Sequence, residues 1–155
     1  METLAIPGNI DTFDVDQGIR ASNATYLHLK RVVSKGVTFI GIGREIPSPL
    51  TDVEIADGTK KKPLAQLLDT TSVLVTHVPP YKIQDKMFIG SHGGSKALRG
   101  LVDTCEPQLL LCGHIHEDPG VTVSGKTTVV NCSLGKRTEG AIVEITDTIK
   151  VIILD

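Results

Sequence analysis

The stretch LLLCGHIHED, Leu109 to Asp118, decides the fold, because it ends an apolar run with a glycine and two histidines. Its first four residues predict a buried strand, and Gly113 allows the chain to turn where that strand ends. If the chain stays extended, side chains alternate, so His114 and His116 point to one side and Ile115 to the other. The two imidazoles are then either metal ligands or polar residues on a solvent-facing edge.

Three more stretches place a polar turn after an apolar strand: IPGNID (6–11), VLVTHVPP (73–80) and VVNCSLG (129–135). Open α/β sheets carry their sites at the carboxyl ends of strands. We therefore expect Asn9 and His77 to converge on His114 and His116. Imidazoles with an amide oxygen suit Zn²⁺, Mn²⁺, Fe²⁺ or Ni²⁺ better than Ca²⁺ or Cu(I). Asp11, by contrast, is expected to be the N-cap of a helix.

The remaining patterns predict a mixed α/β layered fold, because strand and helix periodicities alternate along the chain. His28 falls in a strand without a companion motif and is interpreted as structural. The run Lys60–Lys62 is expected to be a solvated helix start or loop. Expected helices are 11–20, 63–68 and 95–105; expected strands are 4–6, 26–33, 37–42, 72–76, 109–112, 121–123, 127–131, 141–145 and 150–154; and 43–59 is expected to be a long surface loop.

Composition narrows the function classes. The 155 residues predict one domain, 1–155, and the net charge of −2 gives no basic field for nucleic acid or an anionic membrane. No apolar run is long enough to span a bilayer. The three cysteines lie in apolar segments without C-x-x-C spacing, which indicates reduced thiols and a cytoplasmic location. Aromatic residues make up 3%, which argues against a stacking platform.

The ordered motifs G-N-x-D (Gly8–Asp11), T-H-x-P-P (Thr76–Pro80) and G-H-x-H (Gly113–His116) resemble those of the calcineurin-like metallophosphoesterases. The stretch SHGGSKALRGLVDTCEPQLLLCGHIHE (91–117) is similar to compact archaeal and bacterial members, and the resemblance covers essentially the whole chain. It implies a four-layer α-β-β-α sandwich and hydrolysis of phosphate esters, either phosphodiesters or small phosphorylated metabolites.

The resemblance also implies two divalent ions, Mn, Fe, Zn or Ni. Asn9, His77 and His114 would hold one ion, and His116 the other. Two ions about 3.5–4 Å apart activate a water, orient the phosphorus and neutralise charge on the departing oxygen.

The chain departs from the family pattern upstream of Gly8. The family's D-x-H and G-D-x-x-D motifs, which supply further ligands and a bridging carboxylate, precede G-N-H-[DE], but only seven residues precede Gly8 here. We therefore expect the carboxyl portion of a metallophosphoesterase domain, which binds one metal weakly or none and hydrolyses poorly. We also expect it to form a homo-oligomer or to associate with a missing amino-terminal segment. The alternative function is a non-catalytic interaction module or an inactive remnant.

A second departure is Ile10, where many relatives carry a histidine that contacts phosphate or protonates the leaving group. Isoleucine transfers no proton, so we expect His92, in Ser91–Ser95, to take the catalytic and substrate-binding role. Lys96 would add positive charge at the following helix start. The alternative interpretation is a glycine-rich loop capped by Ser95.

Overall fold

The computed structural model describes residues 2–50, 53–135 and 139–154. Its helices are α1 (Phe13–Ala21), α2 (Leu64–Leu67) and α3 (Lys96–Cys105). Its strands are β1 (Leu4–Ala5), β2 (Thr25–Tyr26), β3 (Lys30–Ser34), β4 (Val37–Ile42), β5 (Glu54–Asp57), β6 (Lys60–Pro63), β7 (Val73–Thr76), β8 (Leu109–Cys112), β9 (Gly120–Ser124), β10 (Thr127–Asn131), β11 (Gly140–Ile145) and β12 (Ile149–Leu154). None of the described helices is long and apolar enough to cross a membrane.

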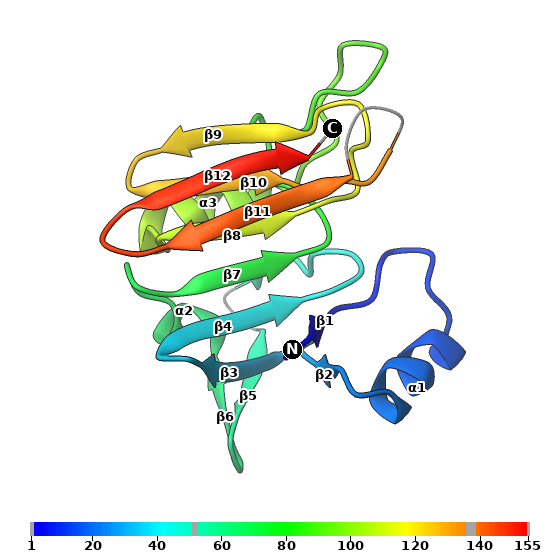
Figure 1. Cartoon of the computed structure of the whole chain (residues 1–155), viewed down its shortest axis with the longest axis vertical. Coiled ribbons are helices and arrows are strands. Elements are labelled where there is room, and N and C mark those ends of the chain that lie inside the picture. Colours follow the sequence, from blue (N-terminus) through cyan, green and yellow to red (C-terminus); the bar gives the residue numbers. More distant parts are fainter. Residues whose placement is uncertain (1, 51–52, 136–138, 155) are drawn as a thin grey trace.

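The centre of the fold is an eight-stranded sheet in the order β6-β5-β3-β4-β7-β8-β10-β9. Its middle strands β4, β7, β8 and β10 are parallel, whereas the β3–β4, β5–β6 and β9–β10 pairs are antiparallel. The parallel strands therefore end at one edge, the right-hand edge in Figure 1. This edge receives the histidine-bearing turns.

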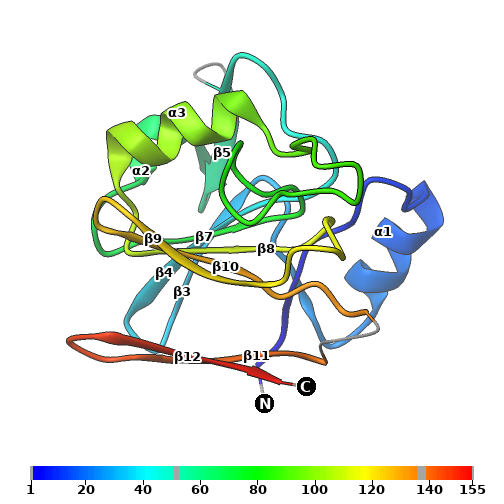
Figure 2. The ribbon, with the colours of Figure 1, turned by 90° about the horizontal axis from the view of Figure 1, so that it is seen from above.

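The sheet is covered on both faces (Figure 2). Helices α2 and α3 lie on one face, where Leu98, Leu101 and Val102 of α3 are buried. Ser95 begins α3, because its side-chain oxygen accepts a hydrogen bond from Leu98 N at 3.2 Å, as the sequence predicted. The β11–β12 hairpin packs on the other face, and β1 and β2 form a separate parallel pair near α1. The mixed α/β layered architecture is thus confirmed.

Three local expectations were wrong in the first half of the chain. The supposed surface loop 43–59 contains β5, whose Ile55 is completely buried, and the lysine run forms the exposed strand β6 that pairs with it. The expected strand 26–33 is interrupted at Leu29, which has φ 54°. Prolines and glycines around 43–59 concealed a short strand in which Ile55 and Ala56 are flanked by two acidic residues. Residues 51–52 of that loop lie outside the described residues.

Candidate metal centre

The ends of neighbouring parallel strands position two histidine turns. His77 N donates to Ile42 O at 3.1 Å, which continues the β4–β7 ladder one residue past β7. Gly113 N in turn donates to His77 O at 3.0 Å. The sheet hydrogen bonding therefore fixes the backbone of both turns before their side chains make any contact.

The Gly8–Asp11 turn brings the asparagine to the same edge. Arg44 N donates to Pro7 O at 2.8 Å, which ties this segment to the end of β4. Asp11 does not cap α1, contrary to expectation: the N-cap is Thr12, and the Asp11 carboxylate accepts from Gly8 N at 2.6 Å. A Cβ on Gly8 would lie 3.2 Å from His77 Cε1, so glycine permits this close approach.

Three potential ligand atoms meet between these turns. His77 Nε2 lies 2.9 Å from Asn9 Oδ1 and 3.1 Å from His114 Nδ1, and the two rings stand edge to face. Ligands at about 2.1 Å from one ion, in adjacent octahedral positions, are separated by about 3 Å. The donor set and its spacing thus fit one divalent ion of the kind that imidazole and amide oxygen favour.

His114 reaches this position through a turn and not through an extended strand. Its φ is 71°, and Ile115 N donates to Gly113 O at 2.8 Å. The condition under which His114 and His116 would alternate with Ile115, an extended segment, is therefore not met. A left-handed histidine stores local strain, of order 1–3 kcal/mol, of a kind that concentrates at functional sites.

His116 lies near the other imidazoles without joining their hydrogen bonds. Its Nδ1 donates to Leu134 O at 2.6 Å, which leaves Nε2 available as a ligand. After burial, the charge of His116 is a further cause that lowers the pKa values of His77 and His114, so the three rings interact electrostatically. The described residues contain no group of three or more His, Cys, Asp or Glu side chains placed to hold a metal, because the compact set is two histidines and an asparagine.

Burial lowers the pKa values of both His77 and His114, and neighbouring imidazoles lower them further. Asp11 opposes this effect at His77, and Glu117 opposes it at His114. The neutral imidazole carries the lone pair that a metal needs. The environment therefore favours the ligand form of both rings.

Comparison with known proteins agrees with this geometry. The family model for calcineurin-like phosphoesterases matches residues 1–118. The chain belongs to this family. Members of this family are metal-dependent phosphoesterases that generally use divalent ions.

Relatives of this member of the calcineurin-like phosphoesterase family include archaeal and nematode proteins. The chain is 32% identical over 145 residues to the uncharacterized protein MJ1162 of Methanocaldococcus jannaschii. The matched region covers 86% of the chain and 64% of that protein. The chain is 33% identical over 132 residues to the UPF0046 protein K07C11.7 of Caenorhabditis elegans. This matched region covers 77% of the chain and 43% of that protein. The chain therefore spans less than two thirds of the length of these relatives.

Solved structures share the fold. The protein TT1561 of Thermus thermophilus superposes with a TM-score of 0.63 at 17% identity, over 99% of this chain and 72% of the other. A further crystal structure gives a TM-score of 0.72 at 18% identity, over 100% of this chain and 66% of the other. At these identities the likeness concerns the fold alone.

Asn131 organises these turns through hydrogen bonds to their backbone. It lies in the VVNCSLG stretch (129–135), whose polar turn the sequence places after an apolar strand, yet its side chain is wholly buried. Its Nδ2 lies 2.8 Å from Ile115 O, 3.0 Å from Asp118 O and 3.1 Å from Gln84 O, while Oδ1 accepts from Ser133. One amide thus joins the G-H-x-H turn to the 81–94 loop, so Asn131 positions His116 without facing the metal.

His92 belongs to a separate set of contacts. Its Nδ1 donates to Asp85 Oδ1 at 2.6 Å, and Asp85 is 1% exposed. The other Asp85 oxygen accepts from Lys82 N and Gly94 N, both at 2.9 Å. A Cβ on Gly94 would lie 2.7 Å from that oxygen, so a glycine is required there.

Lys96 does not contact this histidine–aspartate pair directly, because the Tyr81 ring lies between them. Its Nζ is 5.3 Å from the centre of the Tyr81 ring, which packs edge to face on His92 at 5.6 Å. The sequence contained no signal for Asp85, because a lone acid in a polar loop has no distinguishing spacing. Only the fold brings it to His92.

Proposed function

We propose that this chain hydrolyses phosphate esters of small molecules, phosphodiesters or phosphorylated metabolites, in the cytoplasm, using divalent ions held by Asn9, His77, His114 and His116. The observation that carries the proposal is the convergence of Asn9 Oδ1, His77 Nε2 and His114 Nδ1 from three segments far apart in the sequence. His77 Nε2 lies 2.9 and 3.1 Å from the other two ligand-type atoms, and the pKa values of both imidazoles are lowered, so a shared ion is a direct explanation of the arrangement.

The proposed division of ligands follows the contacts. Asn9, His77 and His114 hold one ion, and His116 contributes Nε2 to a second, whose other ligands come from outside this cluster. Mn²⁺, Fe²⁺, Zn²⁺ and Ni²⁺ all suit such donors. When bound, these ions activate water and neutralise charge on the phosphate.

His92 supplies the proton in this proposal, because the residue beside the ligand Asn9 cannot. Ile10 is 86% exposed and carries no titratable group. The Asp85 carboxylate accepts from His92 Nδ1–H and so orients the ring. In the imidazolium form, with a proton on each nitrogen, Nε2–H gives its proton to the departing oxygen and leaves the neutral ring with Nδ1–H. Lys96 and the amino end of α3 add positive potential for the phosphate.

The decisive experiment loads the purified chain with Mn²⁺, counts bound ions and follows hydrolysis of bis(4-nitrophenyl) phosphate. We expect His114→Ala to lose more than about tenfold in Mn²⁺ affinity, and hydrolysis with it. His28→Asn is the matched control, since His28 forms no hydrogen bond with Asn9, His77 or His114 and its Nδ1 accepts from Gly43 N. Equal ion counts and equal rates for wild type and His114→Ala would refute the proposal.

His92→Ala tests the proton donor separately. We expect its rate to fall by about 10²–10⁴ with Mn²⁺ affinity unchanged. An unchanged rate removes His92 from the mechanism and leaves the metal proposal intact.

A second candidate function, a non-catalytic interaction module, is favoured by the exposed outer face of the β11–β12 hairpin. Ile142 and Ile152 are 55% and 60% exposed there. Wild type that binds Mn²⁺ yet hydrolyses no phosphate ester would support this candidate over the enzyme.

A further inference from the structure

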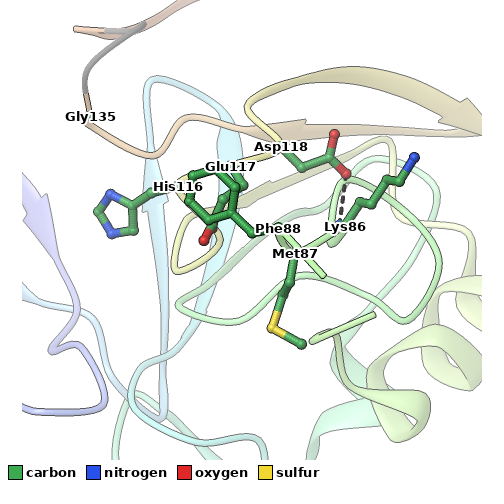
Figure 3. Close-up of a pocket in the computed structure, with 7 residues that line it drawn as sticks. All are labelled: Lys86, Met87, Phe88, His116, Glu117, Asp118 and Gly135. Atoms are coloured by element: carbon green, nitrogen blue, oxygen red, sulfur yellow. Dashed lines mark hydrogen bonds between the residues drawn. The ribbon is translucent and has the colours of Figure 1, made fainter. Parts of the chain in front are cut away.

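A pocket of about 600 Å³ opens directly beside His116. One wall is formed by Lys86, Met87 and Phe88 from the 81–94 loop, and the other by the turn 116–118 with Gly135 (Figure 3). This volume lies within the range of small-molecule sites. Because His116 lines it, a group held in the pocket is adjacent to the proposed metal centre.

Phe88 is an exposed aromatic residue on a firmly held support. Its side chain is 91% exposed. The support is a small hairpin in which Lys86 pairs with His92, and Met87 N donates to Ser91 O at 2.9 Å. Lys86 N also donates to Asp118 Oδ2 at 2.9 Å, which ties the two pocket walls together. An uncovered ring on an ordered support is suited to stacking on a ligand.

The charges around the pocket favour some ligands over others. Glu117 is exposed and makes no hydrogen bond or ion pair with any described residue, so its carboxylate can accept from a ligand. Among the described residues that line the pocket, Asp118 adds a second carboxylate and Lys86 carries the one ammonium. The balance is acidic, so a ligand with an additional negative charge is disfavoured.

We propose that this pocket binds the leaving group of the phosphate ester and prefers a flat aromatic group with a positive charge or hydrogen-bond donors over one with a negative charge. Phe88 supplies the stacking surface, and Glu117 supplies the acceptor. This inference rests on the proposed function for the identity of the reaction. The low aromatic content argued against a stacking platform, but a single ring beside the site is sufficient.

The binding test uses alcohols without phosphate, so that it depends on neither metal nor catalysis. Tyramine, tyrosol and 4-hydroxyphenylacetate share one ring and differ mainly in charge. We expect NMR titrations to show binding that weakens in that order. Phe88→Ala should weaken all three about three- to tenfold, and Glu117→Gln should remove the preference for tyramine. Phe13→Ala is the matched control, because Phe13 is a 70% exposed phenylalanine on α1, and it should change nothing.

The catalytic test uses the phosphate monoesters of the same three alcohols with the Mn²⁺-loaded chain. We expect kcat/KM to follow the same order, with Phe88→Ala acting mainly through KM. If kcat/KM does not depend on the charge of the leaving group, and Phe88→Ala hydrolyses the esters as Phe13→Ala does, the pocket proposal is wrong. The phosphoesterase proposal is then unaffected. Ordered alcohol binding without hydrolysis of either these monoesters or bis(4-nitrophenyl) phosphate supports the pocket and counts against the phosphoesterase. Absence of shifts at the pocket residues up to about 10 mM alcohol overturns the pocket.

Discussion

At the scale of single residues, Asn131 controls more of the site than its position suggests. Replacing it by Leu removes the donor for the carbonyls of Gln84, Ile115 and Asp118. We expect Mn²⁺ affinity to fall about 10- to 100-fold and the free energy of unfolding to fall by about 2 kcal/mol, measured by calorimetric titration and urea denaturation. Asn131→Asp keeps the size but not the donor, so it should be impaired as well.

Thr127→Val is the control for this prediction, at the opposite end of the same strand, β10. The Thr127 hydroxyl is buried and has no hydrogen-bond partner among the described residues. Valine of nearly equal size should therefore raise the free energy of unfolding, by about 1 kcal/mol, without changing Mn²⁺ affinity. An Asn131→Leu variant that binds Mn²⁺ as tightly as Thr127→Val would contradict the positioning role.

The residues that touch through side chains were more predictable than those that act through the backbone. The T-H-x-P-P and G-H-x-H motifs led directly to His77 and His114, and the structure brings both to Asn9. The function of Asn131 depends on three backbone carbonyls, and that of Asp85 on two amides and a distant histidine. Backbone carbonyls and amides occur at every residue, so hydrogen bonds to them cannot be predicted from a pattern of residue types.

At the scale of elements, His28, which precedes β3, makes the free energy of unfolding depend on pH. Burial lowers its pKa, although the charge of Asp16 opposes this. The unfolded chain then takes up a proton near pH 6.5, whereas the folded chain takes it up only at lower pH, so the free energy of unfolding falls as pH drops below about 6.5. His77 and His114 act in the same direction.

His28→Asn should therefore flatten this pH dependence, by at most about 1.4 kcal/mol per pH unit. Urea denaturation between pH 8 and pH 5, with chelator present to exclude metal, measures it. His116→Asn is the comparison variant for His28→Asn, because the His116 ring is exposed and its hydrogen bond to Leu134 O lies at the surface. A slope that stays the same in His28→Asn would show that the ring does not titrate differently on folding.

The elements themselves were predictable where periodicity was long and capped. Helix α3 has an apolar face over Lys96–Cys105 and a serine cap, and β8 and β10 are apolar runs between turn signals. By contrast, β5 and β6 are four residues each, and β6 is mostly lysine. Their pairing with each other and with β3 stabilises them, which is tertiary context that a local pattern does not contain.

At the scale of the whole molecule, the outer face of the β11–β12 hairpin is uncovered. The strands alternate, so Val143, Val151 and Ile153 pack inward on the main sheet, whereas Ile142 and Ile152 pair across the strands on the outside. Glu144 and Lys150 form the next outward pair, with 3.6 Å between their charged atoms. These four side chains and Val151 line a shallow hollow.

This face is complementary to a second copy of itself. A two-fold axis through the isoleucine pair would bring the Glu144 side chain of one protomer to the partner's Lys150, and apolar surface would meet apolar surface. We therefore expect sedimentation to show a monomer–dimer equilibrium that Ile142→Thr with Ile152→Thr shifts to monomer. Lys150→Glu should weaken the dimer through two like-charged contacts, and adding Glu144→Lys should restore it, because the swapped pair is complementary again. A wild type that stays monomeric at every concentration would contradict self-association. If the monomer–dimer equilibrium changes neither with the isoleucine substitutions nor with the charge swap, the interface lies elsewhere.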